Sequence, residues 1–425
     1  MKTEPADGIT QTIYGIGRSV MEVRCCIAGG GPAGMVLGYL LARAGIDVAI
    51  LEKHKDFLRD FRGDTIHPST LELMYELGIL DGFLRRPHQE LTEIGAQIDD
   101  FPVTIADFSH LPTHCKFVGL MPQWDFLNFI AEEGKRYPQF RLRMECEVTD
   151  LIQENGRVAG VRCRTPQGDL EVRAALTIGA DGRHSLVREK AGLEVIDLGA
   201  PIDVLWMRLS RQPGDPGQTL GRIREGQILV MLDRGDYWQC AHVVVKGAFD
   251  EIRRNGLPAF RENIVRIAPF LHDRLEELKD WDDIKLLSVA VDRLHKWSKP
   301  GLLCIGDSAH AMSPVGGVGI NLAIQDAVAA ANILSLPLRD GKVSAALLEK
   351  VRRRREFPTR VTQAFQVFAH KRVLAPTLEK RTQFRRLPLA FRLLRRFPFL
   401  RRIPARLIGV GVRPEHIRKA RSPER

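Results

Sequence analysis

A chain of 425 residues, of which 44% are hydrophobic and 27% charged, is long enough to form two or three lobes around a substantial core. It has no run approaching the ~18 uncharged apolar residues of a membrane span, and its first residues lack an apolar segment, so we predict neither a transmembrane helix nor a secretory signal. The net charge of +11 lies entirely in residues 385–425, which contain 13 of the 63 Lys and Arg residues but only two of the 52 Asp and Glu residues.

The seven cysteines are odd in number, include no C-x-x-C pair, and fall in several cases within predicted strands. Cysteine at such positions usually behaves as a small buried hydrophobe. We therefore expect a cytoplasmic protein without a disulfide framework or a metal site. Residues 1–21 are expected to form a flexible extension before the first strand.

Residues 23–53 have the order of a nucleotide-binding βαβ unit. An apolar, β-branched run over 23–28 ends at a glycine-rich turn, helical spacing of leucines follows, and a second buried strand over 46–51 ends on Glu52. A glycine triplet alone also occurs in loops that bind nothing, but strand, helix and terminal acid together favour a dinucleotide site. The pattern G-x-G-x-x-G is filled by Gly29, Gly31 and Gly34.

Each glycine of this turn has a separate physical purpose. Gly29 permits a tight turn, Gly31 lets the backbone approach a pyrophosphate, and Gly34 allows close packing of helix on strand. The phosphate then lies at a helix N-terminus, where free N–H groups and the helix dipole favour negative charge. Glu52 is placed to accept a hydrogen bond from a ribose hydroxyl.

The middle of the chain alternates between helical and strand patterns. A helix beginning at Pro68 runs to about residue 77, short antiparallel strands are expected over 93–117, and a helix over 122–137 precedes strands at 141–151. A β-meander over 151–165 and 170–178, with hairpin turns at Asn155-Gly156 and Gln167-Gly168, leads to Asp181.

The second half returns to the nucleotide-binding domain after an insertion. Strand-rich residues 203–245, together with 284–294, predict a second antiparallel sheet, and 258–278 read as a helical bridge. A buried strand over 302–305 then runs into Gly306-Asp307, a glycine-rich turn and a helix over 322–334. We therefore assign 22–93, 121–200 and 295–335 to the nucleotide-binding domain, 94–120 and 201–294 to a substrate domain, and 336–425 to a helical C-terminal region.

Three separated motifs give the chain a family resemblance. The turn at Gly29 with Glu52, then Ala180-Asp181-Gly182, then Gly306-Asp307 before a glycine-rich helix start, resemble the FAD-dependent monooxygenases of the para-hydroxybenzoate hydroxylase class over about residues 23–334. The resemblance implies an α/β fold: a Rossmann-type FAD-binding domain with an inserted antiparallel-sheet substrate domain and a helical C-terminal region.

The same resemblance implies how FAD is held. The glycine turn would contact the pyrophosphate beside Arg62, Glu52 the adenosine ribose, Asp307 the ribityl chain, and residues 316–321 the pyrimidine edge, where their N–H groups would stabilise reduced flavin. Gln123 falls where the family has a flavin-contacting residue. The full set of implied FAD-binding residues is Gly29, Gly31, Pro32, Ala33, Gly34, Glu52, Lys53, Arg62, Gln123, Asp181, Asp307, Pro314, Gly316, Gly317, Val318, Gly319, Ile320 and Asn321.

Several of these residues also have a purely structural interpretation. Asp181 could belong to an ordinary turn, Arg62 to a surface ion pair, and Gln123 to a polar helix position. His67 and His310 are better explained as loop histidines with satisfied hydrogen bonds than as catalytic groups. No residue is assigned as catalytic, and no general base for a phenol is apparent.

The implied function is hydroxylation of an aromatic or polycyclic small molecule, a lipophilic one if the C-terminal tail touches membrane, with NAD(P)H and O2 through a flavin C4a-hydroperoxide. The sequence shows no second nucleotide fingerprint, so it does not distinguish NADH from NADPH. Trp206, Met231, Trp238 and His242 are candidates to line the substrate site, although an aromatic core explains them equally well. A geranylgeranyl-reductase type of enzyme and a non-catalytic flavin-holding protein remain alternatives, and a halogenase is disfavoured because W-x-W-x-I-P is missing.

The basic tail, residues 385–425, combines arginine pairs with large apolar side chains, and its prolines divide it into short helices. Such a segment can lie on anionic lipid at the inner face of the membrane, or pack on the body of the protein with its arginines in solvent. Nucleic acid is a weaker possibility because no binding module accompanies the charge, and the oligomeric state is not indicated. If the tail acts only at the membrane, its removal should leave FAD binding intact.

Overall fold

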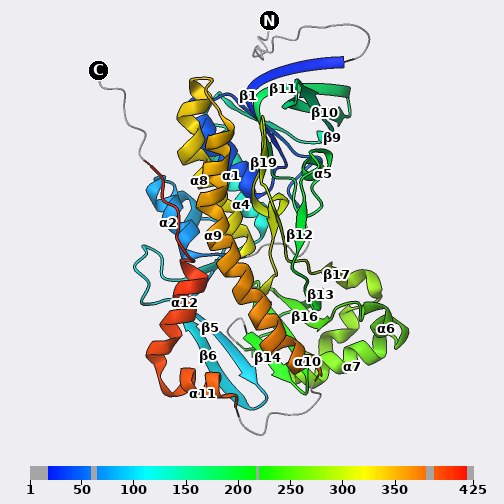
Figure 1. Ribbon diagram of the computed structural model, residues 1–425. Helices are drawn as coiled ribbons and strands as arrows, with labels where there is room; N and C mark the ends of the chain where they lie inside the picture. The colour runs from blue at the N-terminus through cyan, green and yellow to red at the C-terminus, as the bar shows by residue number, and fades with distance from the viewer. Residues whose placement is uncertain (1–17, 59–64, 217–219, 380–386, 419–425) are drawn as a thin grey trace, which may run out of the picture.

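The computed structural model describes residues 18–58, 65–216, 220–379 and 387–418, and within them the chain builds two large sheets joined by long helices (Figure 1). The first sheet has eight strands, of which six follow the order β19-β20-β11-β1-β2-β8. Its strands are β1 (Arg18–Ala28), β2 (Val48–Leu51), β8 (Phe140–Arg143), β9 (Glu147–Glu154), β10 (Arg157–Thr165), β11 (Gly168–Gly179), β19 (Ser298–Lys299) and β20 (Leu302–Cys304). This is the predicted α/β arrangement, with β20, β11, β1, β2 and β8 parallel.

The strand that begins the sheet is longer than predicted. β1 starts at Arg18 rather than at residue 23, because residues 18–22 pair in parallel with residues 169–173 of β11. The flexible extension expected over 1–21 is therefore wrong for residues 18–21, and the rest of it lies outside the described residues. The predicted meander is confirmed, with β9, β10 and β11 joined by a turn at Asn155-Gly156, both with positive φ, and a turn at Gly168.

Long helices cover the first sheet. α1 (Pro32–Arg43) packs on α4 (Gln123–Gly134) and on α8 (Gly319–Arg339), and α8 in turn packs on α9 (Ala345–Ala369), the long helix that runs down the molecule in Figure 1. α8 is apolar and long enough to cross a membrane by length and composition alone, yet 72% of its most apolar 18-residue stretch is buried within the protein. It is therefore the central core helix of this fold.

The second sheet has seven strands in the order β17-β13-β16-β15-β14-β5-β6. They are β5 (Glu93–Ile98), β6 (Phe101–Asp107), β13 (Ile202–Ser210), β14 (Leu220–Arg224), β15 (Gln227–Asp233), β16 (Tyr237–Val245) and β17 (Lys285–Ser288). Two details correct the prediction. β14 and β5 pair in parallel, so the sheet is antiparallel only in its other pairings, and β18 (Asp292–Leu294) leaves it to pair with β12 (Val195–Asp197) and β21 (His310–Ala311).

The two faces of the second sheet have different neighbours. α7 (Leu257–Ile267) and η1 (Pro269–Glu277) pack on one face through Phe260, Ile264 and Leu271, so the segment predicted as a bridge is a layer on the sheet. The other face packs against α9, η5 (His370–Leu374) and α10 (Ala375–Glu379), and against Val315.

The remaining elements are short. A small sheet joins β3 (Thr65–Ile66), β7 (Val118–Leu120) and β4 (Gln89–Leu91) beside α2 (Pro68–Glu76) and α3 (Leu80–Leu84). The others are α5 (Leu186–Lys190), α6 (Phe249–Arg254), η2 (Trp281–Asp283), η3 (Gly306–Ser308) and η4 (Val315–Gly317).

The described part of the basic tail packs on the body. α11 (Leu389–Arg396), η6 (Pro398–Arg401) and α12 (Arg402–Gly409) all contact β6, the outermost strand of the second sheet (Figure 1). Ala405 is fully buried among Ala106, Phe108 and Leu111, while Leu387 packs with Val103. The tail thus covers a sheet edge and an apolar patch that would otherwise face solvent.

Candidate functional site

Four segments that are far apart in the sequence meet at one edge of the first sheet. In the order β20, β11, β1 and β2, the parallel strands end at Cys304, Gly179, Ala28 and Leu51, which are aligned across the sheet. The residues that follow these ends are Gly306-Asp307, Ala180-Asp181, the glycine turn and Glu52. Open parallel sheets bind their ligands outside the carboxyl ends of the strands, so this edge is the candidate site.

The three glycines of the turn differ in what surrounds them. Gly29 has φ of +107°, and a Cβ there would lie 2.3 Å from the carbonyl oxygen of Ala180. A Cβ at Gly34 would lie 2.0 Å from the carbonyl oxygen of Gly29, so only glycine lets α1 pack this closely. A Cβ at Gly31 would meet no atom within 4 Å, which leaves open space against the backbone at the start of α1. Pro32 and Ala33 form the first turn of that helix.

Glu52 is tied to this turn. Its Oε2 accepts the Gly30 N–H at 3.0 Å, and its Oε1 accepts the His54 N–H at 3.1 Å. The side chain is half-buried, whereas Lys53 beside it is exposed. Glu52 is thus held next to the phosphate end of α1 rather than free in solvent.

Asp181 is engaged by its own segment. Its carboxylate accepts hydrogen bonds from the Ser185 hydroxyl at 2.5 Å and the Val187 N–H at 3.0 Å, which together cap α5. Burial raises the pKa of Asp181 above its ordinary value, although these donors oppose the shift. Both carboxylate oxygens have protein partners, so this side chain fixes the turn at Gly182, where φ is +86°.

Asp307 is more accessible than Asp181. Its carboxylate lies 3.8 Å from Arg183, and 34% of its side chain is exposed. The preceding Gly306 has φ of +60° and donates its N–H to Oδ2 of the buried Asp326 at 3.0 Å. Asp307 thus has a partly exposed carboxylate on a turn whose backbone is fixed by the buried Asp326.

The glycine-rich turn before α8 is held by one carboxamide. Nδ2 of Asn321 donates to the carbonyls of Thr65 and Gly317, and its Oδ1 accepts from the His67 N–H at 2.9 Å and the Thr70 hydroxyl at 2.7 Å. The Thr65 hydroxyl also donates to the Gly317 carbonyl. The Asn321 side chain therefore bonds only to protein groups, so a ligand at this turn would be bound through the backbone N–H groups. Gly316 and Gly317 have positive φ, Val318 and Ile320 are buried, and Pro314 and Gly319 are half-buried.

Two predicted residues stand apart. Gln123 is the first residue of α4 and half-buried, and its side chain makes no hydrogen bond within the described parts of the chain. Arg62 lies outside the described residues.

The structure adds two residues that the sequence analysis did not assign, Asp326 and Arg355, and brings them together with His310. Nε2 of His310 donates to Oδ2 of Asp326, 2.6 Å away, and Nε of Arg355 donates to Oδ1 of Asp326 at 3.0 Å. All three side chains are almost completely buried. The sequence did carry a signal: Gln325 and Asp326 are the polar residues in an otherwise apolar stretch over 322–331. A lone acid there requires a buried partner.

The aromatic candidates for the substrate site divide between the two sheet faces. Met231, Trp238 and His242 face α7 and η1, where His242 contacts Phe260 edge-on, so of the two interpretations given for them the structure supports the packed core. Trp206 lies on the opposite face, in the cluster that includes Val315 of the glycine-rich turn. Successive side chains of β13 point to opposite faces of the sheet, so Trp206 and its neighbour Met207 lie on different faces.

Comparisons with known proteins identify the family of the chain. The sequence matches the family described as an FAD binding domain over residues 22–365. It is also 33% identical over 358 residues to the 6-methylpretetramide 4-monooxygenase of Streptomyces rimosus, a match covering 82% of this chain and 84% of that protein. The chain belongs to the FAD-dependent monooxygenases of the para-hydroxybenzoate hydroxylase class. It is an oxidoreductase that uses FAD, NAD(P)H and O2 on an aromatic or polycyclic small molecule.

Other members show the breadth of the family. The dialkyldecalin synthase of Streptomyces rugosporus is 28% identical over 314 residues, which cover 71% of this chain and 63% of that protein. The structure of the anhydrotetracycline hydroxylase OxyS from Streptomyces rimosus superposes with a TM-score of 0.71 at 23% identity, covering 92% of this chain and 76% of that one. The latter likeness shows the shared fold.

The described residues fit FAD. The open space at Gly31 and the N–H groups at the start of α1 suit a pyrophosphate, Glu52 and Asp307 offer acceptors for sugar and ribityl hydroxyls, and the turn before α8 has exposed backbone at Gly316. Glu52, the glycine turn and Asp307 follow the ends of β2, β1 and β20 in one sheet, and the turn at Gly316 follows β21.

Proposed function

We propose that the enzyme hydroxylates a polycyclic aromatic compound. The observation that carries this proposal is the 33% identity, over most of both chains, to a monooxygenase named for 6-methylpretetramide. Similarity over 358 residues extends well beyond the glycine turn and includes the second sheet. A monocyclic phenol is the less favoured substrate.

We further propose the assignment of FAD groups to residues. The pyrophosphate would lie against Gly31 and the start of α1, the adenosine ribose at Glu52, the ribityl chain at Asp307, and the pyrimidine edge at the N–H groups of residues 316–319. When bound, FAD supplies hydride acceptance from NAD(P)H and, with O2, the oxygen atom that is transferred. Asp181 and Asn321 would act by shaping the two turns, because their side-chain atoms bond within those turns. Glu52 also accepts the Gly30 and His54 N–H groups, and would accept a ribose hydroxyl through its remaining lone pairs.

The substrate would lie beside the turn at Val315, next to the face of the second sheet that carries Trp206. This face is apolar, with Val204, Ala241 and Val243 buried on it, and an apolar surface suits a fused-ring substrate. It also excludes water, so that the oxygen atom supplied with FAD would be transferred to the substrate rather than lost as hydrogen peroxide.

The test is stopped-flow absorbance of the FAD-loaded enzyme, reduced by NADPH or NADH in the presence of fused-ring phenols or simple phenols. We expect fused-ring phenols to accelerate flavin reduction and to yield a product heavier by one oxygen atom. Acceleration by simple phenols alone would overturn the substrate class. Product formed in the absence of O2 would indicate a reductase of the geranylgeranyl-reductase type instead.

We also propose that the outer face of the tail contacts anionic lipid. Its inner face packs on β6, but Leu389, Phe399 and Ile403 are 67%, 61% and 66% exposed. The three elements that carry them, α11, η6 and α12, also carry arginines. Large apolar side chains set among basic ones fit an anionic membrane surface, each charge contributing ~1 kcal/mol. The enzyme would then take up a lipophilic substrate at the membrane, in which such a substrate dissolves.

Sedimentation with vesicles tests this second proposal. The L389S/F399S/I403S variant should sediment several-fold less with anionic vesicles than the wild type, while neutral vesicles retain little of either protein. Leu286→Ser, which changes a residue 45% exposed on β17, is the matched control. Equal sedimentation of variant and wild type would remove the lipid proposal and leave the tail as a packing segment.

A further inference from the structure

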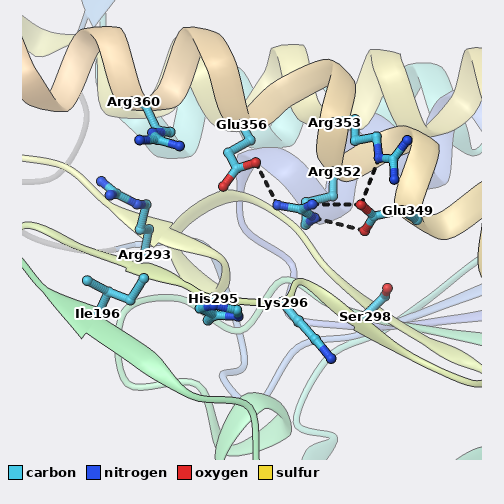
Figure 2. A pocket seen from close by; sticks show the side chains of 10 residues that line it. All are labelled: Ile196, Arg293, His295, Lys296, Ser298, Glu349, Arg352, Arg353, Glu356 and Arg360. Carbon is cyan, nitrogen blue, oxygen red and sulfur yellow. Dashed lines mark hydrogen bonds and ion pairs between the residues drawn. The ribbon is translucent and has the colours of Figure 1, made fainter.

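A basic cavity lies away from the candidate FAD site, between α9 and the strands β12, β18 and β19 (Figure 2). Its volume is about 500 Å³. We name it the basic cavity, and its lining residues are Ile196, Arg293, His295, Lys296, Ser298, Glu349, Arg352, Arg353, Glu356 and Arg360. Five of them are Lys or Arg and two are Glu, which leaves an excess of three positive charges without counting the histidine.

The two carboxylates of the basic cavity are already engaged on their own helix. Arg352 forms two hydrogen bonds with Glu349, at 2.6 and 2.8 Å, and a third with Glu356 at 2.6 Å. Arg353 adds a contact to Glu349 at 3.0 Å. These contacts hold the pKa of Glu349 down at about 2. Neither glutamate is therefore available to neutralise the cations on the far side of the cavity.

The unneutralised cations converge. In Figure 2 the guanidinium groups of Arg293, from β18, and Arg360, from α9, are directed toward the same end of the cavity, while Glu356 is turned to Arg352. Within the described parts of the chain, Arg360 and Lys296 have no ion-pair partner. Like charges so arranged repel unless an anion lies between them.

Arg293 is held in position by a buried group. Its Nη1 donates to Oε1 of Gln363 at 3.2 Å. Gln363 is fully buried, and its Nε2 donates to the carbonyls of Asp292 and Ala311, which fixes its side chain. One guanidinium nitrogen is thus fixed, and the others face the cavity. A pre-oriented guanidinium loses little conformational entropy on binding a planar or tetrahedral oxyanion.

We propose that the basic cavity binds a phosphorylated small molecule through its phosphate groups. Paired guanidinium groups favour phosphate because each can donate two parallel hydrogen bonds to it. The cavity volume exceeds that of a single ion, so a phosphorylated organic molecule fits better than a simple anion. Two sources share this chemistry: the reductant NADPH, and a phosphorylated metabolite that acts independently of the reaction. The site itself does not depend on the proposed hydroxylation of a polycyclic substrate.

Calorimetric titration of the FAD-loaded enzyme with inorganic pyrophosphate tests the site at low ionic strength, where exposed charges are least screened. We expect the R293Q/R360Q variant to bind pyrophosphate at least tenfold more weakly than the wild type. The R253Q/R254Q variant makes the same charge change on the exposed face of α6 and should bind like the wild type. Since Arg293 contacts a buried residue, the single R360Q variant, at an exposed position, is measured as well.

Unchanged pyrophosphate binding in both R360Q and R293Q/R360Q would overturn the proposal, as would equal weakening in R253Q/R254Q, which would indicate bulk charge alone. A second measurement identifies the source. If R360Q raises the KM for NADPH and leaves kcat unchanged, the cavity serves the reductant. If pyrophosphate binding falls and the KM for NADPH stays constant, the cavity serves another phosphorylated molecule, and the phosphate site is still supported. Failure to hydroxylate any polycyclic compound would affect neither titration.

Discussion

Glu415 and Arg355 meet in the interior of the protein: Oε1 of Glu415 lies 3.3 Å from Nη1 of Arg355, although 60 positions separate them in the sequence. Nε of Arg355 also contacts Asp326, which accepts the Gly306 N–H. The end of the described chain is thereby linked through two buried side chains to the turn that carries Asp307. Burial alone would keep Asp326 neutral, but His310 and Arg355 outweigh it and hold the pKa of Asp326 below its ordinary value.

Removing Arg355 should therefore be costly. Arg355→Met leaves Asp326 and Glu415 buried without their shared cation, and we expect a loss of about 3–5 kcal/mol in the free energy of unfolding. Urea unfolding followed by circular dichroism measures it. Arg353→Met, two positions earlier on α9 with 76% of the side chain exposed, should cost no more than about 0.5 kcal/mol. A similar small loss in both variants would contradict the link.

The glycine turn allows steric and ligand effects to be separated. Gly31 has φ of −75°, and a Cβ at this position would meet no atom within 4 Å, so Gly31→Ala should fold with an unchanged melting temperature in the absence of FAD. It should nevertheless bind FAD at least tenfold more weakly, because the added methyl group occupies the proposed pyrophosphate position. Flavin fluorescence titration measures the affinity. Full affinity in Gly31→Ala would place the pyrophosphate elsewhere.

Gly34→Ala provides the contrasting case. Its methyl group would lie 2.0 Å from the Gly29 carbonyl oxygen, so α1 must move away from β1 whether or not FAD is present. We expect a lower melting temperature for the apoprotein as well as poor FAD binding. An apoprotein as stable as the wild type would contradict this close packing of helix on strand.

The carboxylate of Asp307 is partly exposed and therefore available to hydroxyl groups. Asp307→Ala should weaken FAD binding about tenfold to a hundredfold, the effect of losing hydrogen bonds to a charged group. The FAD affinity of Asp307→Asn, which retains one acceptor oxygen, should lie between those of the wild type and Asp307→Ala. The ratio of flavin to protein absorbance after gel filtration checks this, and full flavin occupancy in Asp307→Ala would remove the assignment.

Two buried histidines give the stability a defined pH dependence. Burial lowers the pKa of His67 and of His242 to about 4. Between about pH 6.5, the unfolded value, and pH 4, the unfolded chain binds more protons than the folded one, so stability falls as the pH is lowered through this window. The slope is about 1.4 kcal/mol per pH unit for each such histidine.

Thermal unfolding at several pH values between 7.5 and 5 measures that slope. His242→Leu should make it shallower, because the variant has one buried histidine fewer, while substitution of the exposed His272 is the control. An unchanged slope in His242→Leu would show that this ring accepts a proton in the folded protein.

Truncation of the basic tail should have a different outcome from the one expected from the sequence alone. Ala405 covers Phe108 and Leu111, the Ile408 carbonyl lies 2.7 Å from Nδ1 of His67, and Glu415 pairs with Arg355. A chain ending at residue 384 should therefore lose FAD and aggregate. A monomeric, FAD-loaded truncated protein, shown by gel filtration, would mean that these contacts are dispensable.

Much of the site could be predicted because its residues follow strands whose partners are parallel. Periodicity located the strands that end before Glu52, Asp181 and Asp307, and the carboxyl ends of parallel strands share one edge. The contact of these residues with FAD, by contrast, was implied by the family resemblance and not by local patterns.

Other features depend on which surfaces meet, which local pattern does not specify. Met231 and Trp206 each have a side chain that alternates to one face of the second sheet, but the sequence does not say that α7 covers the face of Met231. The parallel pairing of β14 with β5 and the packing of α12 on β6 likewise join distant segments. Buried ion pairs such as the one between Arg355 and Asp326 were the least predictable.

The contacts of Ile408 and Glu415 also bear on the order in which the protein is made. Both residues lie far downstream of the glycine turn at Gly29, so the ribosome releases that turn well before it makes them. The nascent chain can form β1, α1 and β2 early, but His67 and Arg355 gain these partners only after residues 408–415 have been synthesised. Cofactor loading is therefore expected to follow synthesis of this segment, so that a polypeptide cut short before residue 408 would remain colourless.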